Sequence, residues 1–331
     1  MIQYKELNDP EIRDVIIIGG GIAGLSAAIY LGRAQRDTLV VDSGHSMAKW
    51  EPIVENYLGF ADGIHGEELL RQGRLQAQRH EVQFAEDRIV DLESEEGIFV
   101  AHGERGVYRA KRLLLATGIF HLPPEIPGVK ECLGYSMFFC KDCDGYRVRE
   151  KTIAICGAND EAVEYALGLL HYSPCVMIAT NGEKPRWSAQ HSKWIEEYKI
   201  PVHLGRIHDV VHRDRQILSL RFGEEQEVKM DCIFTTRGDI FHTKLAEKLG
   251  AKLDEEGQIQ VDHCMRTTVR NLYAAGCVTP ANCQMIIAAG EGAASAQAIN
   301  GDQFEESLET HTLRVFRAVQ LREEETIPEG V

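Results

Sequence analysis

Two cysteines in the middle of the chain have the spacing of a reactive pair. Residues 138–146 read FFCKDCDGY, which sets Cys140 and Cys143 two residues apart and puts Asp144 directly after them. Such a pair can carry a reversible disulfide, hold half of a zinc site, or remain as buried thiols. At a helix start the pKa of one thiol falls, and the resulting thiolate is the form that attacks a disulfide. A neighbouring carboxyl group can protonate the thiolate that leaves.

The surrounding residues favour a redox centre over the other two interpretations. A structural zinc ion needs four ligands, usually from two such pairs, and the sequence holds a single CxxC motif. The charged neighbours Lys141, Asp142 and Asp144 do not suit an apolar core of inert thiols. The histidines show no metal-binding spacing, so we predict no metal site. For Asp144 the alternative role is a solvated turn residue that caps the residues after it.

Composition limits the class of protein. The chain has 331 residues, 9 cysteines and a formal net charge of −15, which is enough length for two domains. The negative charge argues against binding to nucleic acid or to anionic membranes. Because no apolar run reaches membrane-spanning length and the first residues show no signal peptide, we expect a cytoplasmic protein. The other seven cysteines are expected to be small buried residues.

A dinucleotide-binding unit is predicted near the N-terminus. The sequence DVIIIGGGIAGLSAAIYLGRA predicts a strand over 14–18, a turn at Gly19, Gly21 and Gly24, and then an Ala- and Leu-rich helix. A second strand, TLVVD, ends at Asp42. The glycines let a pyrophosphate approach the backbone N–H groups of the helix start, and the acid can accept hydrogen bonds from an adenosine ribose. All parts occur in the required order, so we predict a dinucleotide site.

A second unit of the same kind follows with a damaged fingerprint. KTIAICGANDEAVEYALGLL predicts strand, turn and helix, and CVMIAT predicts the next strand. Aligned on the helix start, the turn reads Gly157-x-Asn159-x-x-Ala162, with asparagine in place of the second glycine. After the second strand, Lys184 and Arg186 do not form the basic cluster that binds a 2′-phosphate. We interpret this as a domain that kept its fold and lost its nucleotide.

The segments around the second unit predict how the chain is organised. An apolar strand ends in Ala116-Thr117-Gly118 and leads into a Pro-rich linker, while NLYAAG predicts a strand after the second unit. A small-residue helix is expected over 283–299. From residue 310 the tail has apolar residues at near-helical spacing, which predicts a helix over the body or a dimer partner.

Taken together, these motifs resemble the low-molecular-weight thioredoxin reductases over most of the chain. Their Cys-x-x-Cys-Asp-Gly motif is matched by CKDCDG at Cys140 to Gly145, just ahead of the second unit. The resemblance implies an FAD-dependent thiol–disulfide oxidoreductase, with Cys143 as the thiol nearer the flavin, Cys140 as its partner and Asp144 as general acid–base. It also implies a homodimer, a rotating inserted domain, and a thioredoxin-like protein disulfide as partner.

The same resemblance implies the fold class and its boundaries. The fold is α/β, with two doubly wound (Rossmann-like, FAD/NAD(P)-binding) domains, the second inserted into the first. We expect a discontinuous FAD-binding domain over 1–120 and 247–331, and an inserted domain that carries the CxxC motif over 121–246. Segments near 119–128 and 236–246 are the expected hinges.

Further segments resemble the FAD-binding segments of that family. VENYLG (54–59) is similar to a family loop whose asparagine, here Asn56, lies beside FAD. ATG (116–118) matches the segment that leaves the FAD domain, and CQMIIAAG (283–290) resembles the helix that meets the flavin. With the glycine turn and the third motif, the expected FAD-binding residues are Gly19, Gly21, Gly24, Asp42, Asn56, Ala116, Thr117, Gly118, Gly276, Cys277, Gln284 and Met285.

Departures from the family pattern concern the electron donor. Ala275-Gly276-Cys277 stands where the family has Ala-Gly-Asp, whose carboxylate holds the ribityl chain, and a thiol is a poor acceptor. With Asn159 and the missing basic cluster, the chain is similar to the NADPH-independent branches, most of all the deeply rooted type. NADPH is therefore a doubtful donor, and a protein such as ferredoxin is the alternative.

Two other enzyme interpretations stay open. One is a dithiol oxidase for a small molecule that passes electrons to oxygen, and the other is an NADPH-dependent thioredoxin reductase with a divergent site. Cys277 and Cys283 could form a second disulfide, but spacing does not determine the Cα separation that a disulfide needs. We therefore expect Cys277 to replace an aspartate and Cys283 to pack as a free thiol.

Overall fold

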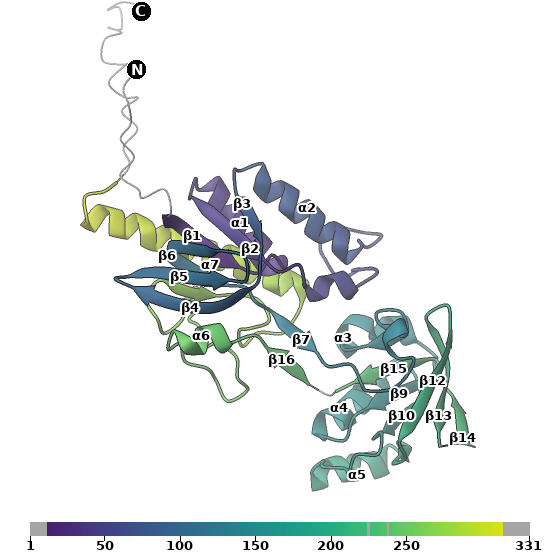
Figure 1. Cartoon of the computed structure of the whole chain (residues 1–331). Helices are drawn as coiled ribbons and strands as arrows, with labels where there is room; N and C mark the ends of the chain where they lie inside the picture. The colour runs from purple at the N-terminus through teal and green to yellow at the C-terminus, as the bar shows by residue number, and fades with distance from the viewer. Residues whose placement is uncertain (1–11, 224–225, 237, 314–331) are drawn as a thin grey trace, which may run out of the picture.

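The computed structural model describes residues 12–223, 226–236 and 238–313 (Figure 1). The tail helix expected from the sequence lies, from residue 314 onward, outside these residues. Among the described residues, no helix is long and apolar enough to cross a membrane.

A seven-stranded sheet organises the first unit. The strand order is β3-β2-β1-β6-β5-β4, and a late strand, β17, also pairs with β6. The bounds are β1 (Ile12–Ile18), β2 (Thr38–Asp42), β3 (Gln83–Glu86), β4 (Ile89–Glu95), β5 (Ile98–Gly103), β6 (Val107–Leu115) and β17 (Leu272–Ala274). The strands β1, β2, β3, β6 and β17 run parallel, while β4 and β5 add antiparallel pairs. Chain from both ends of the sequence therefore builds one sheet.

Helices bury the two faces of this sheet, which explains its nearly continuous apolar strands. Helices α1 (Ile22–Arg33) and α7 (Met285–Glu309) pack into one core with β1 and β6. Helix α6 (Lys244–Lys248) contributes to a core on the other face. Helix α2 (Gly66–Gln78) and the 3-10 turn η1 (Met47–Trp50) lie beside α1.

A smaller sheet organises the second unit. Five parallel strands follow the order β11-β10-β9-β15-β8. Helices α4 and α5 cover one face, and an antiparallel sheet of β12, β13 and β14 covers the other (Figure 1). The bounds are β8 (Met137–Phe138), β9 (Ile153–Cys156), α4 (Asp160–Leu169), β10 (Val176–Ala179), α5 (Ala189–Glu197), β11 (Val202–His203), β12 (Ile207–Arg213), β13 (Gln216–Phe222), β14 (Gln226–Lys229) and β15 (Cys232–Thr235).

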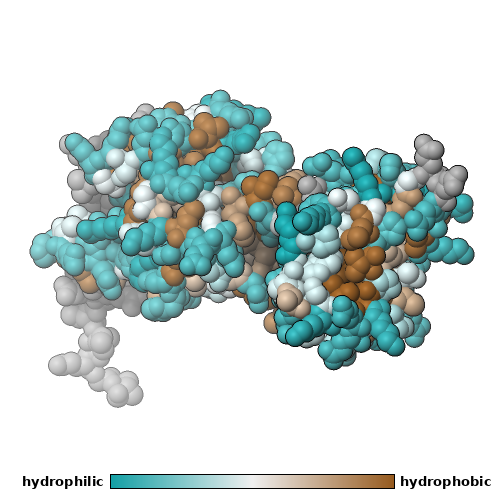
Figure 2. All heavy atoms as spheres, turned by 90° about the horizontal axis from the view of Figure 1, so that it is seen from below, coloured by the Kyte–Doolittle hydropathy of each residue, from teal (hydrophilic) through white to brown (hydrophobic). Residues whose placement is uncertain are grey.

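A short two-stranded ribbon links the two units. Strand β7 (Ile119–His121) pairs antiparallel with β16 (Asp239–Phe241). The chain leaves the first unit through β7 and returns through β16 (Figure 1). Seen from below in Figure 2, most of the surface is hydrophilic, and apolar residues gather where the two lobes meet and on one face of the smaller lobe.

The predicted α/β class with two Rossmann-like units is confirmed. The last helix differs most from its prediction, because α7 ends at Glu309 instead of residue 299. Tertiary contacts stabilise these extra turns: Arg36 Nε donates to Asn300 Oδ1 at 2.7 Å, and Arg112 forms an ion pair with Glu306 at 2.5 Å. The local pattern of apolar residues does not reveal these partners, because Arg36 and Arg112 lie far from α7 along the chain.

Helix α7 supplies a direct test of the close packing between α1 and α7. A Cβ added at Gly292 would lie 2.1 Å from the Ala23 carbonyl oxygen, whereas one at Gly290 meets nothing within 4 Å. We expect Gly292→Ala to lower the free energy of unfolding by about 1–3 kcal/mol through overpacking. The matched Gly290→Ala change should be neutral or stabilise by up to about 1 kcal/mol. Denaturant titration of both variants checks this, and equal effects would contradict it.

Candidate functional site

The cysteine pair of the CxxC motif forms a disulfide at the start of a short helix. The Cα atoms of Cys140 and Cys143 lie 5.3 Å apart. Cys140 caps α3 (Lys141–Asp144), and its Sγ accepts a hydrogen bond from the backbone N–H of Cys143 at 3.1 Å. A 3-10 turn, η3 (Gly145–Val148), continues the helix. The pair thus sits at a helix start, in the oxidised form.

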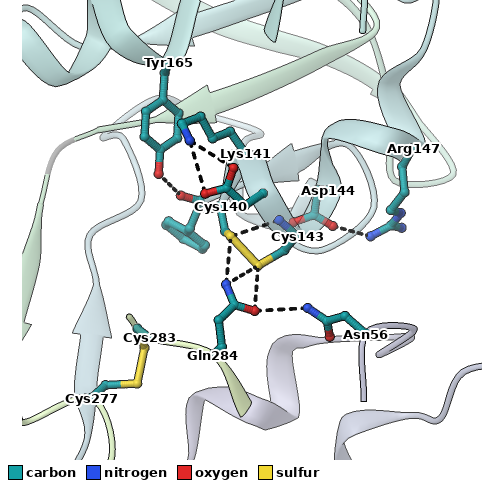
Figure 3. The surroundings of a disulfide bond; sticks show 12 residues. Asn56, Cys140, Lys141, Cys143, Asp144, Arg147, Tyr165, Cys277, Cys283 and Gln284 are labelled. Atoms are coloured by element: carbon teal, nitrogen blue, oxygen red, sulfur yellow. Dashed lines mark hydrogen bonds and ion pairs between the residues drawn. A yellow bond between two sulfur atoms is a disulfide. The ribbon is translucent and has the colours of Figure 1, made fainter. Parts of the chain in front are cut away.

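Side chains of the first unit reach this disulfide across the junction (Figure 3). Gln284 Nε2 donates to Cys143 Sγ at 3.1 Å and lies 3.5 Å from Cys140 Sγ. Asn56 Nδ2 donates to Gln284 Oε1 at 3.0 Å, which orients the amide. Of two residues nominated from separate segments of the sequence, Gln284 therefore contacts the sulfur atoms and Asn56 holds Gln284 in place.

Asp144 lies behind the disulfide in a buried position. Its side chain accepts a hydrogen bond from Arg147 at 2.8 Å, and the residue is 7% exposed. Burial raises the pKa of Asp144, while the Arg147 charge opposes the rise. Arg147 is itself held by the Gly134 carbonyl at 3.1 Å and by the Phe138 ring. A solvated turn aspartate, the alternative role, does not fit this environment.

A second buried carboxyl group, Glu51, belongs to the same surroundings and was missed by sequence reasoning. Burial raises the pKa of Glu51 to about 7, with a further rise from the Asp144 charge and opposing effects of Arg147 and His121. Trp50, beside it, packs on the ring of Phe120 in the linking ribbon and on the ring of Phe139 in the second unit. The segment MAKWEP contains a single acid among apolar neighbours, and that is the signal that could have identified Glu51.

The glycine turn of the first unit is shaped for close backbone approach. Gly19 has φ +108°, and a Cβ there would lie 2.2 Å from the Ala116 carbonyl oxygen. A Cβ at Gly24 would lie 1.9 Å from the Gly19 carbonyl oxygen, and one at Gly20 would contact the Asp42 carboxyl at 2.7 Å. Glycine is therefore required for this path of the chain.

The helix that follows this turn has an open N-terminus. Gly21 is the N-cap of α1, no side chain caps it, and no acid occupies the first turn. A cleft of about 270 Å³ beside it is lined by Gly20, Asp42, Ser46 and Lys49, among others. Backbone N–H groups, a helix dipole and a lysine favour a pyrophosphate here, and Asp42 suits a ribose hydroxyl. The residues present fit a bound dinucleotide.

The remaining nominated residues lie around the root of the linker ribbon and the start of α7. Thr117 Oγ1 donates to the His242 carbonyl at 2.8 Å, and Gly118 takes φ +66° at the entry to β7. Met285 packs against the small apolar cluster of Leu25, Ala48 and Leu70. Thr117 and Gly118 thus lie where the chain leaves the first unit, and their hydrogen bonds in the described structure go to His242 and not to the cysteine pair.

The third motif corrects an expectation from the sequence. Cys277 and Cys283 form a disulfide with Cα atoms 5.0 Å apart, instead of two unpaired thiols. Gly276, with φ +83°, turns the chain out of β17 so that the two cysteines face each other across the loop before α7. Sequence spacing could not show this, because the return of the loop depends on how β17 and α7 pack.

A glutamate from α7 was also missed at this motif. Glu291 accepts hydrogen bonds from the Gly276 backbone N–H at 2.7 Å and from Thr279 Oγ1 at 3.0 Å. Burial raises the pKa of Glu291, and these two hydrogen bonds oppose the rise. A single acid within the small-residue run AAGEGAAS is the signal in the sequence.

The helix N-terminus of the second unit differs from that of the first. Asn159 caps α4 with its own side chain, accepting from the Ala162 N–H at 3.2 Å and from Thr236 Oγ1 at 3.1 Å. Asp160 and Glu161 occupy the first turn of α4. The following loop crosses this end, because the Arg186 N–H donates to the Ala158 carbonyl at 2.7 Å and the Ser188 N–H to Asp160 at 2.6 Å.

The sequence had suggested that the other cysteines are all buried, and this is wrong for some of them. Cys132, Cys156 and Cys232 are buried, Cys264 is half-buried, and Cys175 is exposed. Cys175 directly precedes β10, where the local pattern of apolar residues does not show which elements cover a side chain.

The fold and the site together define a disulfide oxidoreductase built on two dinucleotide folds. The chain belongs to the family described as pyridine nucleotide-disulphide oxidoreductase, whose model matches residues 13–298. Membership makes it a thioredoxin reductase-like flavoprotein, a flavin-dependent disulfide oxidoreductase, and the family implies FAD as the dinucleotide.

Its relatives are thioredoxin reductases and similar oxidoreductases. The thioredoxin reductase of Treponema pallidum is 32% identical over 294 residues, which cover 86% of this chain and 95% of that protein. Among solved structures, HlmI is 26% identical with a TM-score of 0.86, covering 93% of this chain and 98% of its own. The atypical thioredoxin reductase TRi from Desulfovibrio vulgaris Hildenborough is 31% identical with a TM-score of 0.51, covering 89% and 99%.

Proposed function

We propose that this protein is an FAD-dependent, thioredoxin reductase-like enzyme of the NADPH-independent branch. It moves electrons between FAD and a protein disulfide through Cys140 and Cys143. The observation that carries the proposal is the contrast between its two dinucleotide-type turns. One turn leads to an open helix N-terminus at α1, and the other leads to a closed and acidic N-terminus at α4.

The N-terminus of α4 is poorly suited to a pyrophosphate. The Asn159 side chain already satisfies a backbone N–H that a phosphate would need, and Asp160 and Glu161 repel an anion. The loop from Arg186 to Ser188 crosses this helix end and donates backbone hydrogen bonds to the Ala158 carbonyl and the Asp160 carboxyl group. Arg186, a candidate for a 2′-phosphate, lies 3.4 Å from Glu183 instead. These contacts support a second unit without a nicotinamide.

Each residue of the site has its own role in the proposed electron transfer. FAD, when bound, supplies a two-electron carrier, and the open α1 turn with Asp42 would hold it. Cys143 is the thiol nearer the flavin and Cys140 its partner, one attacking the substrate disulfide and the other resolving the mixed disulfide. Asp144, whose pKa is raised by burial, protonates the departing thiolate. Gln284 and Asn56 position the sulfur pair.

The partner and the domain motion are part of the same proposal. Names of the relatives support a thioredoxin-like protein as the disulfide substrate. We place the first domain at 1–120 and 247–331 and the inserted domain at 121–246, with the ribbon of β7 and β16 as the hinge. We further propose that the enzyme is a cytoplasmic homodimer and that a protein such as ferredoxin donates its electrons.

The electron donor can be tested directly. The FAD-loaded protein is mixed without oxygen with NADPH, then NADH, and its flavin absorbance is followed. We expect no bleaching on the timescale of turnover, and full bleaching with dithionite or reduced ferredoxin. Fast bleaching by NADPH would refute the proposal and identify an NADPH-dependent enzyme with a divergent site. Rapid oxygen consumption with small dithiols, with no reduction of thioredoxin, would favour a dithiol oxidase.

A further inference from the structure

The second disulfide lies at the edge of the same site. Cys277 and Cys283 bridge the loop between β17 and α7, and Cys283 is exposed while Cys277 is half-buried. Figure 3 shows this bridge on the side of the first unit, with Gln284 extending from the same segment to the other disulfide. An incoming thiolate can therefore reach Cys283, with Cys277 as the sulfur that leaves.

The fold has little structural need for this bridge. It joins cysteines separated by 6 positions, and closing so short a loop stabilises a chain by only about 2 kcal/mol. The elements on both sides are already anchored in a core, since Ala274 is 0% exposed and Ile299 is 0% exposed. Five other cysteines of the described chain form no disulfide. A bridge without a structural task suggests a chemical one.

Its surroundings favour thiol chemistry. Cys283 directly precedes Gln284, the N-cap of the 25-residue helix α7, and no side chain caps that helix end. The positive end of the helix dipole favours the thiolate of Cys283 once the bridge is open. Cys283 is also next in sequence to Gln284, whose side-chain amide donates to Cys143 Sγ at 3.1 Å, so one short segment carries an exposed sulfur and the contact to the first pair.

We propose that Cys277–Cys283 is a second redox-active disulfide, reduced by the Cys140/Cys143 dithiol through thiol–disulfide exchange. The inference rests on the proposed function in one respect, namely that the Cys140–Cys143 pair becomes reduced. A thiolate of that pair attacks Cys283 Sγ, the bond to Cys277 breaks, and Cys277 leaves as a thiolate that takes up a proton. The second thiol of the pair then loses its proton and displaces Cys283.

The exchange balances and moves the electron pair outward. Cys140 and Cys143 end as a disulfide, and Cys277 and Cys283 end as two thiols that hold the two electrons. The first pair is half-buried against Gln284, whereas Cys283 is exposed. Electrons therefore reach a sulfur that a bulky protein disulfide can approach while the two units keep this arrangement.

Electron counting with thiol labelling tests the proposal. The FAD-loaded full chain is titrated with dithionite without oxygen, then alkylated, and the labelled cysteines are identified by peptide mass. We expect uptake of two electrons by the flavin and two by each disulfide, with label on all four cysteines. In Cys140→Ser/Cys143→Ser protein we expect uptake by the flavin alone and no label on Cys277 or Cys283. Cys175→Ser, a change at an exposed free thiol, should leave electron uptake unchanged.

The outcomes separate this inference from the proposed function. Label on Cys140 and Cys143 but not on Cys277 and Cys283 would overturn the second redox site and leave the proposed function standing. Label on Cys277 and Cys283 in the variant without the first pair would overturn the exchange between the two. Absence of label on Cys140 and Cys143 in the unchanged chain would instead refute the proposed function.

Discussion

Cys143→Ser protein is expected to bind FAD normally and to reduce no protein disulfide. A serine hydroxyl cannot form or accept a disulfide bond, and residues that act as one unit lose nearly all activity when one is removed. We expect a fall in turnover of about a thousandfold or more. FAD retention should be unchanged, since the open turn of α1 and the Asp42 cleft belong to the other unit.

Turnover of thioredoxin disulfide and the ratio of flavin to protein absorbance measure the two effects. Cys175→Ser is the matched control, because it removes an exposed cysteine that forms no disulfide. Full activity of Cys143→Ser protein would contradict electron transfer through the Cys140–Cys143 pair. Cys140→Ser should be equally inactive, and whichever variant retains a covalent adduct with the substrate shows which cysteine attacks first.

Glu51→Gln is expected to stabilise the protein at alkaline pH and to change little in mild acid. Burial raises the pKa of Glu51 from 4.5 to about 7, so between these values the folded state keeps a proton that the unfolded state releases. Stability therefore falls as pH rises through this window. The rise in pKa corresponds to about 3 kcal/mol above pH 7, and glutamine, which does not ionise, avoids that cost.

Thermal unfolding of both proteins at pH 5 and pH 8 checks this prediction. The variant should gain several degrees at pH 8 and almost nothing at pH 5. Glu196→Gln, on the exposed side of α5, serves as the control and should show no such difference. An equal gain at both pH values would mean that the proton of Glu51 is not responsible. Because Asp144 is one of the charges that act on Glu51, the pH profile of disulfide turnover should shift as well.

Local patterns in the sequence were sufficient for the separate parts of the site. The turn at Gly19, Gly21 and Gly24 and the CxxC pair are read from neighbouring residues, because their geometry depends on a few backbone angles and one helix start. The family resemblance added Asn56 and Gln284; in the structure Gln284 contacts the sulfur atoms and Asn56 contacts Gln284. The altered glycine motif of the second unit could also be recognised from neighbouring residues, and in the structure Asn159 caps α4.

By itself, then, the sequence determined two dinucleotide folds, a reactive cysteine pair and the acid beside it. Only the tertiary structure decided that Cys277 and Cys283 are bonded, that Glu51 is buried near Asp144, and that Gln284 spans the junction to the disulfide. The physical reason is distance along the chain. Hydrophobic periodicity and turn residues report only on neighbouring positions in the sequence. The burial of a side chain, its pKa and the distance between two sulfur atoms depend on segments that come together when both units fold.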